Sequence, residues 1–289
     1  RKSLIALYDI GSNEVLRKLF MYRFSNGKGI KGHTLGNLLM VAMTDILGSE
    51  VEAIEMFKTI FSIKGDIIPV TLDDSRLVAE YENGEVIEGE HLIDEPEDDR
   101  NITRIYLKPA AKANENAIRA IEKADYIILG PGDLYTTTLA NIVVDGIKQS
   151  IQKSKAKIIC IGNLMSKKGQ TRNLTQSGYL KIVERYIGRN VDYFLINNGK
   201  IPTKAYERYL KKGEHIIVDD LSAEETKAKI IRADLVATAP VVREKGDKLE
   251  RSLVRHDSKK LFRELNKIFY SESTLISKLF GTFISYYKD

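Results

Sequence analysis

A glycine turn after an apolar strand is the part of this sequence best suited to ligand chemistry. Residues 125–129 predict a buried strand, and Gly130-Pro131-Gly132 and a threonine-rich helix follow directly. Glycines let backbone amides approach a phosphate, and the N-terminus of a helix favours anions. The candidate ligand-binding residues here are Gly130, Pro131, Gly132, Asp133, Tyr135, Thr136 and Thr137. The alternative is an ordinary strand-to-helix turn in which Thr136 or Thr137 caps the helix.

A second loop, residues 162–171, follows the next predicted strand, residues 157–161. Neighbouring parallel strands end at the same edge of a sheet, so we expect the two loops to form a cleft. Asn163 is a candidate for reading a base or a sugar through its amide, and Met165 is a further candidate contact. Lys167 and Lys168 could neutralise phosphate as point charges, but a polar surface loop is the preferred interpretation for both.

The third candidate segment, residues 29–39, is a glycine-bearing loop that leads into a very apolar helix. His33 at the helix entrance could bond a ligand or exchange a proton near neutral pH. A histidine beside a capping Thr34 could equally satisfy local backbone groups. Asn37 lies one turn inside the helix, where a buried amide would need polar partners. Both residues are therefore candidate ligand contacts.

Composition excludes several classes of protein. The formal charge of +5 and the pI near 9.0 would suit nucleic acid, but basic and acidic residues alternate along most of the chain, so we expect no nucleic-acid partner. No apolar run reaches the length of a membrane span, and the expected location is the cytoplasm. A single cysteine, Cys160, excludes an internal disulfide and a structural zinc site.

Hydrophobic periodicity predicts the elements that position these residues. Helical periodicity spans 13–23, 34–47 and 50–61. Period-two patterns predict an antiparallel meander from strands at 67–72, 76–81 and 86–93, with Asn83-Gly84 as a hairpin turn, followed by a strand at 102–107. Further apolar runs alternate with helices and predict strands at 125–129, 157–161, 191–196 and 215–218, a shorter one near Leu235, and a closing helix at 258–269.

This alternation predicts an α/β fold, a three-layer αβα sandwich with a mostly parallel sheet. We expect one composite domain over residues 1–289, because no repeat or flexible linker divides the chain. Its parts are a helical lobe at 1–65, a small antiparallel β meander at 66–110 and a Rossmann-like core at 111–289.

Three motifs resemble the CofD-like family, and within it the YvcK-type branch of gluconeogenesis factors. GHTLGNLL at residues 32–39 is similar to the family's GHSLGNLLL, GPGDLYTT at 130–137 to GPGSLYTS, and NLMSKKGQT at 163–171 to NLMTQPGET. Further likenesses at 22–24, 69–72 and 255–257 extend the resemblance over essentially the whole chain. The first residues look like the family segment that follows its glycine-rich GGGTG turn, so we expect that turn upstream of Arg1.

The resemblance implies a Rossmann-like core with an inserted helical lobe. In the YvcK-type branch it implies binding of a UDP-sugar such as UDP-N-acetylglucosamine, a role in carbon metabolism and in cell-wall or cell-shape control, and no settled reaction. The sister branch is an enzyme, 2-phospho-L-lactate transferase, which moves a phospholactyl group from a nucleotide-activated donor to a hydroxyl; Mg²⁺-dependent transfer is therefore the alternative function. A homodimer and enzymes of cell-wall or carbon metabolism are the partners that the resemblance implies.

The sequence departs from the family pattern at three positions. Asp133 stands where the family has serine, Ala140 where it has proline, and Gln170 where it has glutamate. An aspartate beside phosphate is repulsive unless a cation intervenes. Asp133 is therefore expected either to contact Mg²⁺, as a weak metal candidate, or to point away from the phosphate.

Overall fold

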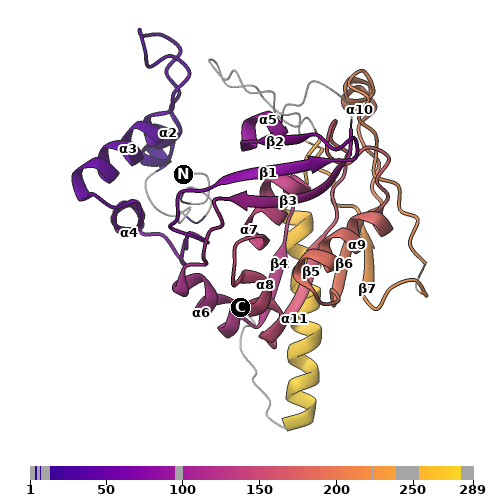
Figure 1. Cartoon of the computed structure of the whole chain (residues 1–289). Helices are drawn as coiled ribbons and strands as arrows, with labels where there is room; N and C mark the ends of the chain where they lie inside the picture. The colour runs from indigo at the N-terminus through magenta and orange to yellow at the C-terminus, as the bar shows by residue number, and fades with distance from the viewer. Residues whose placement is uncertain are drawn as a thin grey trace. The chain divides into compact units, whose positions relative to one another are not determined.

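A computed structural model describes residues 4, 7, 14–94, 100–222, 224–238 and 254–280, with side chains up to residue 271 (Figure 1). The chain divides into two compact units, residues 1–72 with 241–252 and residues 73–240 with 253–289. Helices make up the described elements of the first unit, and both sheets belong to the second.

The first unit contains helices α2 (Glu14–Met21), α3 (Leu35–Leu47) and α4 (Glu50–Ile60). The side chains of Thr34 and Ser49 accept hydrogen bonds from backbone N–H groups at the starts of α3 and α4, which fixes where these helices begin. Phe20, Phe57 and Phe61 form its aromatic core, with the Phe20 and Phe61 ring centroids 4.6 Å apart. The helical periodicity of the sequence is confirmed here.

An antiparallel sheet in the second unit has the order β2-β1-β3, with β1 (Arg76–Tyr81), β2 (Val86–Glu88) and β3 (Ile102–Lys108). The hairpin between β1 and β2 is confirmed. Two details of the predicted meander are wrong. Residues 67–72 form no strand, since Pro69 has no N–H to donate to a ladder. The strand predicted at 86–93 stops at Glu88, because Gly89 has a φ of 108° and helix α5 (Glu90–Asp94) follows.

The main sheet is parallel and has the order β4-β5-β6-β7. Its strands are β4 (Tyr126–Leu129), β5 (Lys157–Ile161), β6 (Tyr193–Asn197) and β7 (Lys229–Ala233). Strands β5 and β6 are buried almost throughout, as their unbroken apolar runs predict. The predicted α/β fold with a parallel sheet is confirmed. The strand expected near Leu235 is β7, which ends two residues earlier.

Helices connect and cover these strands: α6 (Glu115–Lys123), the π-helix η1 (Leu134–Leu139), α7 (Ala140–Ile142), α8 (Ile147–Lys153), α9 (Gln176–Ile187), α10 (Thr203–Leu210) and α11 (Ser258–Phe280). Ile268 of α11 packs against Ile159 and Leu195, so α11 covers one face of the sheet (yellow in Figure 1). Tyr179 of α9 stacks on Phe194 of β6 with ring centroids 6.2 Å apart. No helix among the described residues has the length and the apolar character needed to cross a bilayer.

The strand predicted at 215–218 is wrong as a member of the main sheet. This segment instead hydrogen-bonds to the loop that follows β5: Ser166 N–H donates to the His215 carbonyl (2.7 Å), and Ile217 N–H donates to the Leu164 carbonyl (3.2 Å). The segment 215–218 thus supports the loop that follows β5. The consequence is that residues 164–166 are held by backbone hydrogen bonds at the carboxyl edge of the sheet.

We expect the stability of the second unit to depend on its parallel sheet. Replacing fully buried Leu195 with alanine should lower the free energy of unfolding by about 2–5 kcal/mol, because it removes apolar contacts and leaves a cavity. Phe262→Ala is the matched control, since Phe262 is 62% exposed on α11 and its loss should cost roughly 0.5 kcal/mol or less. Urea denaturation followed by circular dichroism measures both; equal losses in the two variants would contradict this account of the core.

Candidate functional site

The glycine turn lies where β4 meets η1, at the carboxyl edge of the parallel sheet. Gly130 has a φ of 83°, a conformation that favours glycine, and a Cβ added there would lie 3.2 Å from the Ile161 carbonyl oxygen. A Cβ on Gly132 would lie 2.9 Å from Thr137 Cγ2. The backbone conformation and the packing of the turn on β5 therefore favour glycine at position 130 whether or not a ligand binds, whereas a side chain at position 132 would require Thr137 to move.

Backbone N–H groups at the start of η1 point to an anion site. Thr137 and Thr138 N–H both donate to the Asp133 carbonyl, at 3.1 and 2.9 Å. The N–H groups from Gly132 to Thr136 have no hydrogen-bond acceptor among the described residues. Asp133 occupies the N-cap position without making a side-chain cap. The turn thus carries five backbone donors without an acceptor at the positive end of a helix dipole, and π-helical turns of this kind are frequent at functional sites.

The side chains of Tyr135 and Thr136 are structural rather than exposed to a ligand. The buried Tyr135 hydroxyl donates to the Ile102 carbonyl (3.1 Å) and so connects η1 to β3. Thr136, also buried, donates to Asp94 Oδ1 (3.0 Å). Because this hydroxyl is used by Asp94, the alternative in which Thr136 caps the helix is wrong. Pro131 and Thr137 are the exposed residues of the turn.

Lys167 joins three segments that are distant in sequence. Its Nζ lies 2.7 Å from Asp133 Oδ2 and also bonds Asp94 Oδ1 at the end of α5. Gln170 Nε2 donates to the same Asp94 oxygen (3.2 Å). The interpretation of Lys167 as part of a solvated surface loop is therefore wrong, since only 25% of its side chain is exposed. The Lys167 ammonium group is a cation beside the Asp133 carboxylate and can compensate its negative charge.

The charged forms of Asp94 and Lys167 are both stabilised within this cluster. Burial alone would raise the pKa of Asp94, but hydrogen bonds from Lys167, Thr136 and Gln170 outweigh it and lower that pKa below its ordinary value. Burial would lower the pKa of Lys167, but its bonds to Asp133 and Asp94 raise it above the ordinary value. At neutral pH the cluster therefore holds a charged lysine beside the open N–H groups of the turn.

The loop after β5 brings Asn163 and Met165 to the same edge of the sheet as the turn. Both side chains are partly exposed, and Met165 forms a β-bridge to Ile216. The Asn163 backbone carbonyl accepts a hydrogen bond from Gln176 Nε2 (3.0 Å), which holds this part of the loop against the start of α9. Since Lys167 of this loop contacts Asp133 of the turn, the structure unites nine of the eleven predicted residues at one edge of the second unit.

His33 and Asn37 belong to the first unit. His33 is exposed, its N–H donates to the Ile30 carbonyl (3.0 Å) and its carbonyl accepts from Phe24 N–H (3.0 Å). Asn37 is exposed on α3, so the expectation of a buried amide is wrong: the apolar helix keeps one face in solvent. The Thr34 cap is confirmed, since Asn37 N–H donates to Thr34 Oγ1 (3.3 Å).

Sequence reasoning missed Asp94, Gln170 and His256 as residues of this edge. His256 forms a β-bridge to Val236, and its ring hydrogen-bonds the backbone of Gly162 at the end of β5. Its Nε2 and Gln170 Oε1 are buried without a hydrogen-bond partner among the described residues. Buried unpaired polar atoms are rare and require an explanation, such as a ligand or ordered water. The likeness of residues 255–257 to the family was the one signal for His256.

A metal site does not form from the described side chains alone. They contain no group of three or more histidine, cysteine, aspartate or glutamate residues arranged to hold a metal ion. Asp94 and Asp133 both contact Lys167, so Mg²⁺ would have to displace the ammonium group to bind there.

The environment of His256 predicts a pH effect on stability. Burial lowers the pKa of His256 from 6.5 to about 4, so the folded chain resists a proton that the unfolded chain accepts. Between pH 7 and pH 5 this should lower the free energy of unfolding by about 2 kcal/mol. His256→Asn should lose less stability over that interval in urea titrations at the two pH values. Identical losses in the variant and the native chain would contradict the neutral, buried imidazole.

Comparison with known proteins identifies the family. The sequence model of the CofD family, described as 2-phospho-L-lactate transferase, matches residues 1–236. A relative from Thermotoga maritima, provisionally named a gluconeogenesis factor, is 38% identical over 93% of this chain and 82% of its own length. The gluconeogenesis factor of Bacillus subtilis is 32% identical over 90% of this chain and 78% of its own length.

The fold comparison agrees with the sequence comparison. The crystal structure of a UPF0052 family member from Bacillus halodurans superposes with a TM-score of 0.77 and 31% identity, over 89% of this chain and 79% of that one. The resemblance drawn from the three motifs is confirmed. The chain belongs to the CofD family and, within it, groups with the gluconeogenesis factors.

Proposed function

We propose that this protein is a nucleotide-sugar-binding regulator of central carbon metabolism and of cell-wall or cell-shape control. Its ligand is a UDP-sugar of the UDP-N-acetylglucosamine type, and its place of action is the cytoplasm. The observation that carries the proposal is the row of N–H groups from Gly132 to Thr136 that have no acceptor among the described residues. A diphosphate supplies the anionic oxygens that such donors bind.

In this proposal Lys167 supplies the positive charge for the diphosphate. Its ammonium group already lies beside the turn, 2.7 Å from Asp133 Oδ2. A phosphate oxygen becomes a third partner of the ammonium group, which stays bonded to Asp94 and lies between the Asp133 carboxylate and the phosphate. Because the cation is held in position before the ligand arrives, less conformational entropy is lost on binding.

The remaining predicted residues contact the ends of the ligand. Pro131 and Thr137 form the exposed surface of the turn, and Asn163 and Met165 offer an amide and an apolar side chain for the uracil or the sugar. Tyr135 and Thr136 contribute their backbone N–H groups, because their hydroxyls are used elsewhere. His33 and Asn37 stay candidate ligand contacts within the first unit. A homodimer is the proposed assembly. Enzymes of carbon or cell-wall metabolism are the proposed protein partners.

Lys167→Gln should weaken binding of UDP-N-acetylglucosamine at least about tenfold, because a charged hydrogen bond to the diphosphate is lost. Isothermal titration calorimetry on the full-length protein measures this effect. Lys168→Gln is the matched control: it removes the same charge from the same loop, outside the Asp94 and Asp133 pair, and should leave affinity within about twofold.

Two results would refute this function. One is the absence of both binding heat and a thermal shift at millimolar UDP-N-acetylglucosamine with the full-length protein. The other is an equal loss of affinity in Lys167→Gln and Lys168→Gln, which would indicate a general charge effect in place of a specific contact. Retained folding of both variants is checked by circular dichroism.

A second candidate function is a transferase of the 2-phospho-L-lactate type. It is favoured by the description of the matching family and by two carboxylates, Asp94 and Asp133, beside the turn. In this case Mg²⁺ replaces the Lys167 ammonium and holds the donor diphosphate. Incubating the full-length protein with a nucleotide-activated phospholactate and hydroxyl acceptors, with and without Mg²⁺, separates the two functions. Mg²⁺-dependent turnover supports the enzyme, and binding without turnover supports the regulator.

A further inference from the structure

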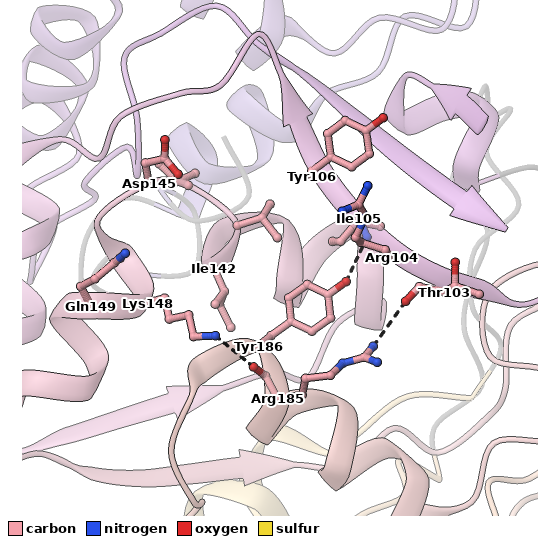
Figure 2. Close-up of a pocket in the computed structure, with 12 residues that line it drawn as sticks. Thr103, Arg104, Ile105, Tyr106, Ile142, Asp145, Lys148, Gln149, Arg185 and Tyr186 are labelled. Carbon is pink, nitrogen blue, oxygen red and sulfur yellow. Dashed lines mark hydrogen bonds between the residues drawn. The ribbon is translucent and has the colours of Figure 1, made fainter. Parts of the chain in front are cut away.

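A cavity of about 460 Å³ lies in the second unit (Figure 2). No residue of the glycine turn is among those that line it. Its walls come from β3, from the segment 142–149 and from the last turn of α9. Ile105, Ile142 and Val144 are all buried and give the cavity an apolar floor. A cavity of this volume is within the range that small organic ligands fill.

The free edge of β3 is already occupied by α9. In the described part of the chain, β3 is the last strand of its sheet, so its outer backbone groups have no partner strand there. Ile105 N–H donates instead to the Tyr186 hydroxyl (2.9 Å), and the Arg185 guanidinium donates to the Thr103 carbonyl (3.4 Å). A peptide strand added at this edge would have to break both bonds. The cavity therefore suits a compact ligand better than an extended peptide.

The polar rim of the cavity carries excess positive charge. Arg104 is neutralised by Glu80, with two hydrogen bonds of 2.6 and 3.1 Å. Lys148 donates to the Arg185 carbonyl (3.3 Å). Among the described residues neither Lys148 nor Arg185 has a carboxylate within ion-pair distance. Asp145 is the one carboxylate among the residues that line the cavity. An anion would therefore find two cations, Lys148 and Arg185, that donate to backbone carbonyls in the described part of the chain.

We propose that this cavity is a second ligand site, for a small organic anion with an aromatic or similarly flat apolar body. The body lies against Ile142 and the ring of Tyr186, and the carboxylate of the anion pairs with Lys148 and Arg185. Figure 2 shows both cationic side chains and the Tyr186 ring on the wall formed by α8 and α9. The site shares no residue with the proposed diphosphate site.

The test uses 1-naphthoate as the probe and 1-naphthamide as its neutral counterpart, titrated into the whole protein and followed by ligand-observed NMR. Naphthoate should bind saturably, and naphthamide at least about tenfold more weakly, because the amide cannot form the ion pairs. Lys148→Gln and Arg185→Gln should each weaken naphthoate binding about tenfold. Lys181→Gln, an exposed position on the same helix, should leave it unchanged, and so should Lys167→Gln.

Absence of saturable naphthoate binding at millimolar concentration would overturn the proposal. Equal affinity for naphthamide, or binding that neither variant changes, would overturn it as well. Binding of an extended acidic peptide in place of naphthoate would assign the surface to a protein partner and would also refute it. If thermal melts show that Arg185→Gln destabilises the fold, Lys148→Gln decides the question, since the Lys148 ammonium contacts one carbonyl oxygen.

Discussion

The ammonium group of Lys167, shared by the carboxylates of Asp94 and Asp133, is the interaction on which the candidate site depends. It joins the end of α5, the glycine turn and the loop after β5 at a single point. Removing one partner from such a partly buried cluster would leave the others with uncompensated charge, which is costly. The turn, the loop and α5 therefore keep a fixed arrangement, and the open N–H groups of η1 lie beside a positive charge.

The rest of the second unit serves to hold this cluster. Gly130 lets the turn pack closely on the Ile161 carbonyl, so that Asp133 faces the neighbouring loop. The segment 215–218 bonds to residues 164–166 and supports the loop from its other side. Tyr135 connects η1 to β3, a strand that also lines the cavity proposed for an organic anion. The two proposed sites thus share no residue and are connected through η1 and β3.

Local patterns in the sequence predicted most of the fold. Strands β5 and β6 are continuous apolar runs, and β1 and β2 flank an Asn-Gly turn, so each was predictable from its own residues. Residues 67–72 and 215–218 were mispredicted because the hydrophobic period and the β-propensity of a segment do not determine which strand it pairs with. Pro69 prevents residues 67–72 from pairing as a strand. Residues 215–218 pair with the loop after β5 and not with the main sheet.

The site was predictable only in part, for the same reason. The glycine turn carries a local signature, whereas Asp94 lies 73 residues from Lys167 and no local pattern connects the two. The environment of Lys167 was therefore misread as a solvated loop, and Asn37 was misread as buried. His256 reaches this edge through residues that are distant in sequence. It pairs with Val236 in a β-bridge, and its ring hydrogen-bonds the backbone of Gly162.

The most direct test of this account is a crystal structure of the full-length protein with UDP-N-acetylglucosamine bound. Diphosphate oxygens should lie within hydrogen-bond distance of the N–H groups between Gly132 and Thr136, with Lys167 Nζ bonded both to a phosphate oxygen and to the Asp94 carboxylate. A diphosphate bound elsewhere on the chain, with no phosphate oxygen at Lys167 Nζ, would contradict the proposed site.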